Sequence, residues 1–145
     1  MASSAELYNL LVVEDDLSEQ KLIKMMVNKS GYSFSIKFIN DGEQAVNYVN
    51  SFPNSESEFS KIHLIFIDLN LPKVSGINVL KAIKGNIYLF KTPVVVLTTS
   101  DSKSDVSLAY EAGASGFVIK PSVIDDYENT IRKILEYWIG ICLIP

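Results

Sequence analysis

Short apolar runs alternate along the chain with segments whose apolar residues recur at helical spacing. Four runs have the length of buried strands, over residues 10–13, 62–67, 94–97 and 115–119. Residues 34–39 alternate apolar and polar side chains instead, which predicts a half-exposed strand at a sheet edge. Helical spacing predicts helices over residues 17–29, 43–50, 74–85, 102–112 and from 122 onward. Five strand and helix pairs with right-handed crossovers give an α/β fold, a doubly wound five-stranded parallel sheet with helices on both faces.

Two segments stand outside this alternation. Residues 51–61 are rich in Ser, Asn and Glu, which predicts a surface loop. From Ile124 to Cys142, apolar residues repeat at steps of three and four, which predicts one continuous helical stripe. We therefore expect a single domain over residues 1–145, with a core of about residues 7–137 and an apolar helical extension to residue 145. One face of the stripe should pack on the sheet, and the remainder, Trp138 included, should form a homodimer patch.

Composition narrows the class of protein. With 145 residues, 48% hydrophobic and 21% charged, the chain is expected to form one globular domain rather than a disordered segment. The net charge of −4 argues against a nucleic-acid-binding surface. Cys142 is the single cysteine, so no internal disulfide is expected. Residues 1–6 lack a secretory signal and no apolar run reaches the length of a membrane span, so we expect a cytoplasmic protein without a membrane partner.

Polar side chains follow four of the apolar strands at the point where each strand ends. They are Glu14 and Asp15, Asp68, Thr98 and Thr99, and Lys120. Because the carboxyl ends of parallel strands lie at one edge of a sheet, these groups are expected to converge there. The sequence therefore predicts a charged site at this edge, with Asp68 at the end of the central strand.

The charges in this set suggest a metal-assisted reaction. Three carboxylates, from Glu14, Asp15 and Asp68, repel one another unless a cation lies among them, and Mg²⁺ prefers such oxygen ligands. With Mg²⁺ and the Lys120 ammonium the total charge comes to about zero. A carboxylate beside these cations is a nucleophile suited to a phosphoryl group, with a hydroxyl and a backbone N–H nearby to bind its oxygens. His63, the single histidine, lies too early in its strand to act as a general base and is expected to be packed or to face solvent.

Four motifs together resemble one known family. They are Leu-Val-Val-Glu-Asp-Asp at 11–16, Phe-Ile-Asp-Leu-Asn-Leu-Pro at 66–72, Val-Leu-Thr-Thr-Ser at 96–100 and Gly-Phe-Val-Ile-Lys-Pro at 116–121. In this order, the motifs are similar to the receiver domain of two-component response regulators. The resemblance implies a flavodoxin-like sheet of order 2-1-3-4-5. It also implies that Asp68 accepts a phosphoryl group from a histidine kinase or a phosphotransfer protein.

The resemblance also assigns roles to individual residues. It implies that Asp15 and Asp68 ligate Mg²⁺, that Asn70 adds its backbone carbonyl, and that Glu14 acts through a bound water. The hydroxyl of Thr98, the backbone N–H of Thr99 and the Lys120 amine would bind the phosphoryl oxygens. Asp16 is expected to cap the first helix. Thr98 and Phe117 match the two residues that move when a receiver switches between its conformations.

Within the family, the chain is similar to the small stand-alone regulators paired with bacterial phytochrome kinases. This narrower likeness rests on Asp-Leu-Asn-Leu-Pro-Lys, Val-Val-Val-Leu-Thr-Thr-Ser and the Tyr-Trp near the C-terminus. No effector domain is expected, so the signal should leave through surface contacts with a downstream protein. A receiver should catalyse only its own phosphorylation and dephosphorylation.

Two other classes of function are alternatives for this set of residues. A phosphatase of the haloacid dehalogenase type also uses a strand-end Asp with Mg²⁺, but it needs a second Asp two positions later, where this chain has Asn70. A degenerate receiver, acting as a binding module without phosphorylation, would lack the Asp, the Thr or the Lys, and none is missing here. Both alternatives are separable from a receiver by phosphorylation experiments.

Overall fold

A five-stranded parallel sheet forms the centre of the computed structural model, which describes residues 7–54 and 59–145. The strands lie in the order β2-β1-β3-β4-β5, which confirms the predicted topology. Their bounds are β1 Leu7–Val13, β2 Ser33–Ile39, β3 Leu64–Ile67, β4 Val94–Thr98 and β5 Gly116–Ile119. The predictions for residues 1–6 and for the middle of the 51–61 loop, 55–58, lie outside the described residues.

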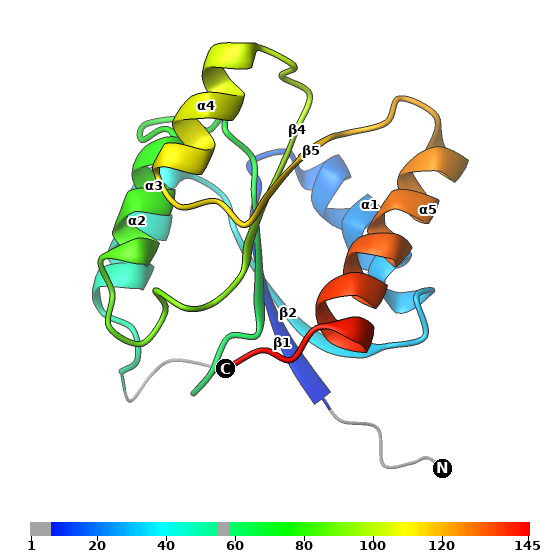
Figure 1. The fold of residues 1–145 in the computed structure, drawn as a ribbon, viewed down its shortest axis with the longest axis horizontal. Helices are drawn as coiled ribbons and strands as arrows, with labels where there is room; N and C mark the ends of the chain where they lie inside the picture. Colours follow the sequence, from blue (N-terminus) through cyan, green and yellow to red (C-terminus); the bar gives the residue numbers. More distant parts are fainter. Residues whose placement is uncertain (1–6, 55–58) are drawn as a thin grey trace.

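Helices cover both faces of the sheet (Figure 1). Helices α1 and α5 lie on one face, and α2, α3 and α4 lie on the other. The helices are α1 Leu17–Asn28, α2 Gly42–Asn50, α3 Gly76–Lys84, α4 Lys103–Glu111 and α5 Ile124–Leu135. No helix in the described part of the chain is both long and apolar enough to cross a bilayer.

The burial of each strand follows its place in the sheet. In β1, Leu10 and Val12 pack against α1 and α5, whereas Leu11 and Val13 pack against α2 and α3. A strand buried on both faces reads as a continuous apolar run, which is why β1, β3 and β4 were recognisable. Strand β2 lies at the edge and is mostly half-buried, as its alternating sequence predicted.

The C-terminal segment differs from the expected continuous helix. Helix α5 ends at Leu135, a π-helical turn, η1, spans Glu136–Ile141, and Cys142 is already extended. A side chain at Gly140 would collide with the Tyr32 hydroxyl, so the close packing of this turn on Tyr32 requires glycine. Cys142 is half-buried. The three- and four-residue periodicity predicted an α-helix throughout this segment and did not predict the wider turn with its i→i+5 hydrogen bonds.

Candidate functional site

The sheet register brings the polar strand ends together. Val13 pairs with Ile67, and the Asp68 N–H donates to the Val13 carbonyl at 3.1 Å, so Glu14 and Asp68 leave the sheet side by side. On β5, the Lys120 N–H donates to the carbonyl of Thr98 at 2.7 Å. The carboxyl ends of β1, β3, β4 and β5 therefore meet at one rim, as predicted.

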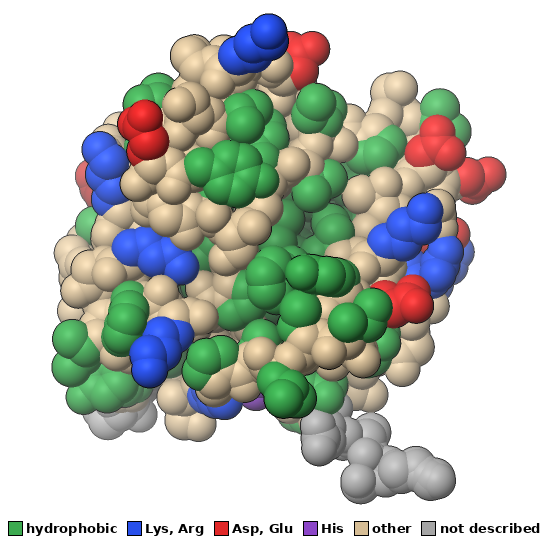
Figure 2. Space-filling view, in the orientation of Figure 1, with side chains coloured by type: hydrophobic (Ala, Val, Ile, Leu, Met, Phe, Trp, Pro, Cys, Tyr) green, Lys and Arg blue, Asp and Glu red, His purple; other side chains and the backbone are tan. Residues whose placement is uncertain are grey.

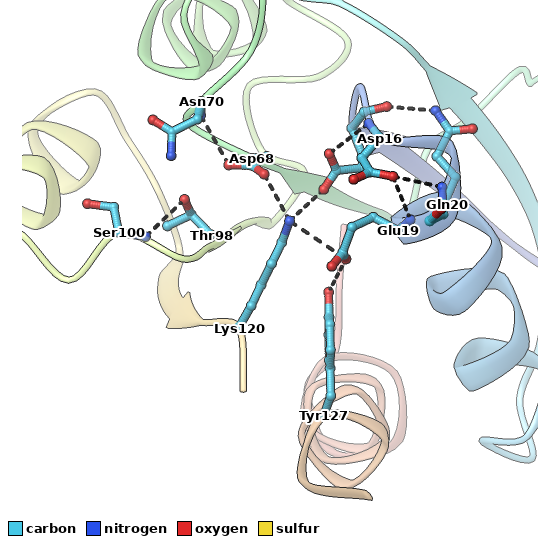
Figure 3. A network of polar contacts seen from close by, with 11 residues as sticks. Asp16, Glu19, Gln20, Asp68, Asn70, Thr98, Ser100, Lys120 and Tyr127 are labelled. Carbon is cyan, nitrogen blue, oxygen red and sulfur yellow. Dashed lines mark hydrogen bonds and ion pairs between the residues drawn. The ribbon is translucent and has the colours of Figure 1, made fainter. Parts of the chain in front are cut away.

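The Lys120 ammonium lies at the centre of this rim (Figure 3). Its Nζ atom is 2.5 Å from Glu14 Oε1 and 2.9 Å from Asp68 Oδ2. The side chain of Lys120 is only 6% exposed, and that of Glu14 only 3%. Residues separated by more than a hundred positions in the chain thus form one buried cluster of charge, and the predicted convergence of Glu14, Asp68 and Lys120 is seen in the structure.

Burial dominates the electrostatics of this cluster. It raises the pKa of Glu14 from 4.5 to about 7, although the hydrogen bond and the charge of Lys120 act in the opposite direction. Burial lowers the pKa of Lys120, but its hydrogen bonds and charge interactions with Glu14 and Asp68 outweigh burial and raise that pKa. Lys120 is therefore a permanent cation at neutral pH, whereas Glu14 exchanges its proton near neutrality.

The predicted metal ligands are only partly gathered. Asp15 is exposed and makes no hydrogen bond or ion pair with the residues that the structure describes. Within the described ranges, no group of three acidic, His or Cys side chains is arranged to hold a metal ion. The Lys120 ammonium takes the position of a cation between Glu14 and Asp68. The set of carboxylate oxygens at the rim nevertheless suits a hard divalent cation.

The Asp68 carboxylate is also fixed by its own loop. Its Oδ1 atom accepts the Asn70 backbone N–H at 3.1 Å, while Oδ2 faces Lys120. A side chain at position 76 would collide with the backbone of Asp68 and Leu69, so Gly76 allows α3 to begin directly against the site. The loop after β3 is thereby held close to the rim.

Strand β4 and its following loop supply the hydroxyl groups. Thr98 is fully buried, and its Oγ1 accepts the Ser100 N–H at 3.4 Å. The Ser100 hydroxyl donates to Asp105 Oδ2 at 2.6 Å, which ties the loop to α4. Thr99 is exposed, so its side chain is outside the buried cluster. The Thr98 hydroxyl thus lies at the rim, at the end of β4. The loop that follows Thr98 is held by a side-chain hydrogen bond.

The predicted switch residue Phe117 lies on β5. It is half-buried and packs against a small cluster of Leu69, Val96 and Ala109. This packing links β5 with the loop after β3, through Leu69, and with α4, through Ala109.

Two residues of the cluster were missed by the sequence analysis. The Tyr127 hydroxyl donates to Glu19 Oε2 at 3.0 Å, and the same oxygen lies 3.7 Å from the Lys120 Nζ atom. Tyr127 falls within the predicted apolar stripe of residues 124–142 and Glu19 within the helix predicted over residues 17–29, and neither was singled out as a site residue. An acidic residue in the first turn of α1 is a signal in hindsight, but nothing local indicates a partner 108 positions away.

Two smaller predictions are confirmed. Asp16 caps α1, because its Oδ1 accepts the N–H groups of Ser18 and Glu19 at 2.8 and 3.3 Å. His63 directly precedes β3, at the end of the strand opposite Asp68, where its Nδ1 accepts the Asn9 N–H at 2.9 Å. His63 is therefore not part of the rim.

Comparison with known proteins identifies the class of protein that this fold and rim define. The profile of the response regulator receiver domain matches residues 10–132, and the chain belongs to this family of two-component signalling proteins.

Its relatives include two regulatory proteins. The chain is 35% identical over 131 residues to the probable methanogenesis regulatory protein FilR2 of Methanothrix harundinacea (strain 6Ac), covering 90% of this chain and 83% of that protein. It is 31% identical over 136 residues to response regulator Rcp1 of Synechocystis sp. (strain ATCC 27184 / PCC 6803 / Kazusa), covering 94% and 92% of the two chains.

Solved structures of similar proteins show the same fold. The phosphorylated cyanobacterial phytochrome response regulator RcpA matches with a TM-score of 0.88 and 28% identity, over 97% of this chain and 99% of that one. The Mn²⁺-bound form of Rcp1 matches with a TM-score of 0.82 and 30% identity, over 95% and 99%.

Proposed function

We propose that this receiver accepts a phosphoryl group on Asp68 and uses it to change conformation. The observation that carries the proposal is the Lys120 ammonium, which lies 2.9 Å from the Asp68 carboxylate and is buried at the rim. A buried cation that contacts a strand-end carboxylate stabilises negative charge arriving at that carboxylate. The phosphorylated structure of the similar regulator RcpA supports this chemistry.

In the proposed step, an Asp68 carboxylate oxygen attacks phosphorus and forms a new P–O bond. The bond between phosphorus and the donor's leaving group breaks, and the electron pair leaves with that group, for example acetate from acetyl phosphate. Lys120, the Thr98 hydroxyl and the Thr99 backbone N–H are proposed to bind the transferred oxygens. The acyl phosphate is the expected product, rather than repeated turnover of a phosphate ester, because His63, the single histidine, lies at the end of its strand opposite Asp68.

We propose Mg²⁺ as the cofactor. Asp15, Asp68 and the Asn70 backbone carbonyl would hold the ion, and Glu14 would contact it through a water. When bound, the ion neutralises charge on the phosphoryl oxygens and on the clustered carboxylates. The exposed Asp15, which has no partner among the described residues, is the ligand free to contribute, and the similar Rcp1 has a Mn²⁺-bound form.

The proposed response is a two-state switch. Binding of the Thr98 hydroxyl to the phosphoryl group would draw the loop after β4 inward, and Phe117 would follow from its half-buried position. Phosphorylation shifts the population only by its preference for one conformation, so a few kcal/mol of differential binding is needed. The hydrogen bond from Ser100 to Asp105 lies in the loop that would move.

A histidine kinase of the phytochrome type is the proposed phosphodonor, because RcpA is a phytochrome response regulator. Purified kinases with and without a phytochrome sensory domain would test this. Transfer of label from a phytochrome kinase at a rate well above that from unrelated kinases supports the proposal. Equal rates from all kinases, or transfer only from a phosphotransfer protein, would contradict it.

The last helices are proposed to supply a protein-binding surface, with a second copy as the expected partner. Figure 2 shows hydrophobic side chains gathered between α4 and α5, where Val118, Ile134, Tyr137 and Trp138 line a shallow pocket. Sedimentation of wild type and Trp138→Lys, with and without acetyl phosphate, tests this assignment. A dimer lost in the variant supports it, and a monomer under every condition contradicts it.

Acetyl phosphate with Mg²⁺ tests the main proposal. Intact-mass measurement should show one added phosphoryl group per chain, absent in Asp68→Asn, absent with EDTA and strongly reduced in Asp15→Ala. Asp101→Asn, which removes an exposed acid from the loop after β4, is the matched control and should label normally. Multiple turnover of phosphomonoesters would favour the phosphatase, and an unlabelled wild type would favour the degenerate receiver. Full labelling of Asp15→Ala would refute the metal assignment.

A further inference from the structure

Glu19 is a third carboxylate beside the Lys120 ammonium. Its Oε2 atom is 3.7 Å from Lys120 Nζ, whereas Asp68 Oδ2 is 2.9 Å away. Figure 3 shows Glu19 and Asp68 on opposite sides of the ammonium. The three carboxylates therefore draw Lys120 in different directions, and Glu19 draws it away from the proposed phosphoacceptor.

Tyr127 fixes Glu19 in this place. The buried hydroxyl of Tyr127, 3% exposed as a residue, donates to Glu19 Oε2 at 3.0 Å from α5. Burial, and then the charge of Glu19, raise the pKa of Tyr127 above its ordinary range, so the hydroxyl remains a donor at neutral pH. The Glu19 backbone is held as well, because its N–H donates to the Asp16 cap at 3.3 Å. The carboxylate is thus oriented from both α1 and α5.

We propose that Glu19, oriented by Tyr127, is a positioning residue that keeps Lys120 in its resting place and weakens binding of a phosphoryl group at Asp68. This inference rests on the proposed function. A phosphoryl group on Asp68 requires the ammonium on its own side, and Glu19 competes for it. The negative charge of Glu19 also repels the arriving anion, so both effects act in the same direction.

Glu19→Gln is the sharpest variant. The amide oxygen of Gln still accepts the Tyr127 hydroxyl, so the variant removes the charge and keeps the hydrogen bond. The probe is beryllofluoride, a phosphoryl mimic, titrated by calorimetry at saturating Mg²⁺. Because the Glu19 side chain is 27% exposed and partly screened, we expect beryllofluoride to bind about three- to tenfold more tightly. A merely structural role would leave the affinity unchanged or weaken it.

Tyr127→Phe tests the orientation of Glu19. Without the hydroxyl, Glu19 turns toward solvent, so affinity should rise, but less than in Glu19→Gln. The double variant should match Glu19→Gln alone, since the hydroxyl has no charge left to orient. Independent additive effects of the two changes would contradict the inference. If Tyr127→Phe does not fold, the Glu19→Gln titration decides alone.

Glu111→Gln is the matched control, because Glu111 is exposed on α4 and forms no ion pair with the described residues. Its affinity for beryllofluoride should equal that of wild type, and a rise equal to that of Glu19→Gln would show an effect of net charge only and overturn the inference. An unchanged or weaker affinity in Glu19→Gln would overturn it directly. A wild-type protein that binds no beryllofluoride would overturn both the proposed function and this inference.

Discussion

The two ends of the central strands are built from different interactions. At the end that precedes β3, neutral groups satisfy one another: His63 Nδ1 accepts the Asn9 N–H, and the Thr92 hydroxyl donates to the Ile62 carbonyl at 3.2 Å. At the opposite end, three carboxylates, from Glu14, Glu19 and Asp68, lie around the buried ammonium of Lys120. Neutral, paired groups stabilise a fold, whereas an excess of one charge is retained where something is to be bound.

This comparison shows that two polar residues can be similarly buried and still have different roles. Glu14 and Thr92 are both buried polar residues, at 3% and 8% exposure. The hydroxyl of Thr92 already donates to a neutral carbonyl, so it needs no hydrogen bond to solvent or to a ligand. The carboxyl of Glu14 keeps a pKa of about 7 even beside an ammonium, so it is poised to change charge when a cation or phosphoryl group arrives.

The largest effect is expected at Lys120. Lys120→Met removes the cation from the rim, and labelling by acetyl phosphate should fall about 100-fold or more, as for loss of one preorganised electrostatic donor. The fold should survive, because Glu14 can take up a proton near neutral pH. Initial labelling rates measured by intact mass, with circular dichroism to verify folding, provide the check.

Thr92→Val is the matched change at the opposite end. It removes a buried hydroxyl donor and should lower the free energy of unfolding by about 1 kcal/mol, with labelling unchanged. Slower labelling in Thr92→Val than in Lys120→Met would reverse the comparison between the two ends.

The next effect is a pH dependence that Glu14 imposes on stability. Its pKa rises from 4.5 in the unfolded chain to about 7 in the fold, so the folded state binds the proton more tightly. The contribution of Glu14 to the free energy of unfolding is therefore fully present below pH 4.5 and is lost as the pH rises through about 7. Relative to Glu14→Gln, the wild-type free energy of unfolding should fall by up to about 3 kcal/mol over this range in EDTA.

Urea unfolding at several pH values measures this difference. Parallel pH profiles for wild type and Glu14→Gln would contradict the assigned pKa. Excess Mg²⁺ should flatten the wild-type profile, because a cation near Glu14 favours its charged form.

A smaller effect is expected from His63→Phe. In the wild type, the His63 ring packs edge to face on Tyr8, with 5.4 Å between the ring centroids, and a Phe ring keeps this contact. The Asn9 N–H, however, loses its acceptor. Unfolding should require about 1–2 kcal/mol less free energy. Labelling of Asp68 should be unchanged, and a loss of labelling without a loss of stability would place His63 in the site after all.

The smallest effect is expected from Asp16→Ala. This variant tests whether an acid next to the rim contributes to stability without contributing to phosphorylation. Loss of the α1 cap should lower the free energy of unfolding by about 1 kcal/mol. Labelling should remain near wild type, in contrast to Asp15→Ala one position earlier. Thermal unfolding and intact mass measured on both proteins distinguish the two neighbouring acids.

Much of the fold could be predicted, because a strand that is buried on both faces consists of consecutive apolar residues. The fully buried parts of β1, β3 and β4, residues 10–13, 64–67 and 94–97, are uninterrupted apolar runs, and the half-buried β2 shows its edge position by alternation. The order of polar residues after each strand then predicted the meeting of Glu14, Asp68 and Lys120, since parallel strands share one carboxyl edge.

The sequence could not show the directions of individual side chains. Adjacent acids Glu14 and Asp15 look equivalent in the chain, yet one is buried against Lys120 and the other is exposed. Tyr127 fits an apolar stripe because most of its surface is a ring, and only the packing of α5 on α1 brings its hydroxyl to Glu19. The π-turn η1 likewise depends on contact with Tyr32, which no local pattern encodes.

The most direct test of the account is the identity of the phosphorylated residue. Wild-type protein labelled with acetyl phosphate and Mg²⁺ is reduced with borohydride, which converts an aspartyl phosphate to homoserine, and the peptides are then mapped by mass spectrometry. We predict homoserine at position 68 alone. Homoserine at position 15 or 16, or no conversion in a protein that has gained a phosphoryl group, would contradict the assignment of Asp68 as the acceptor.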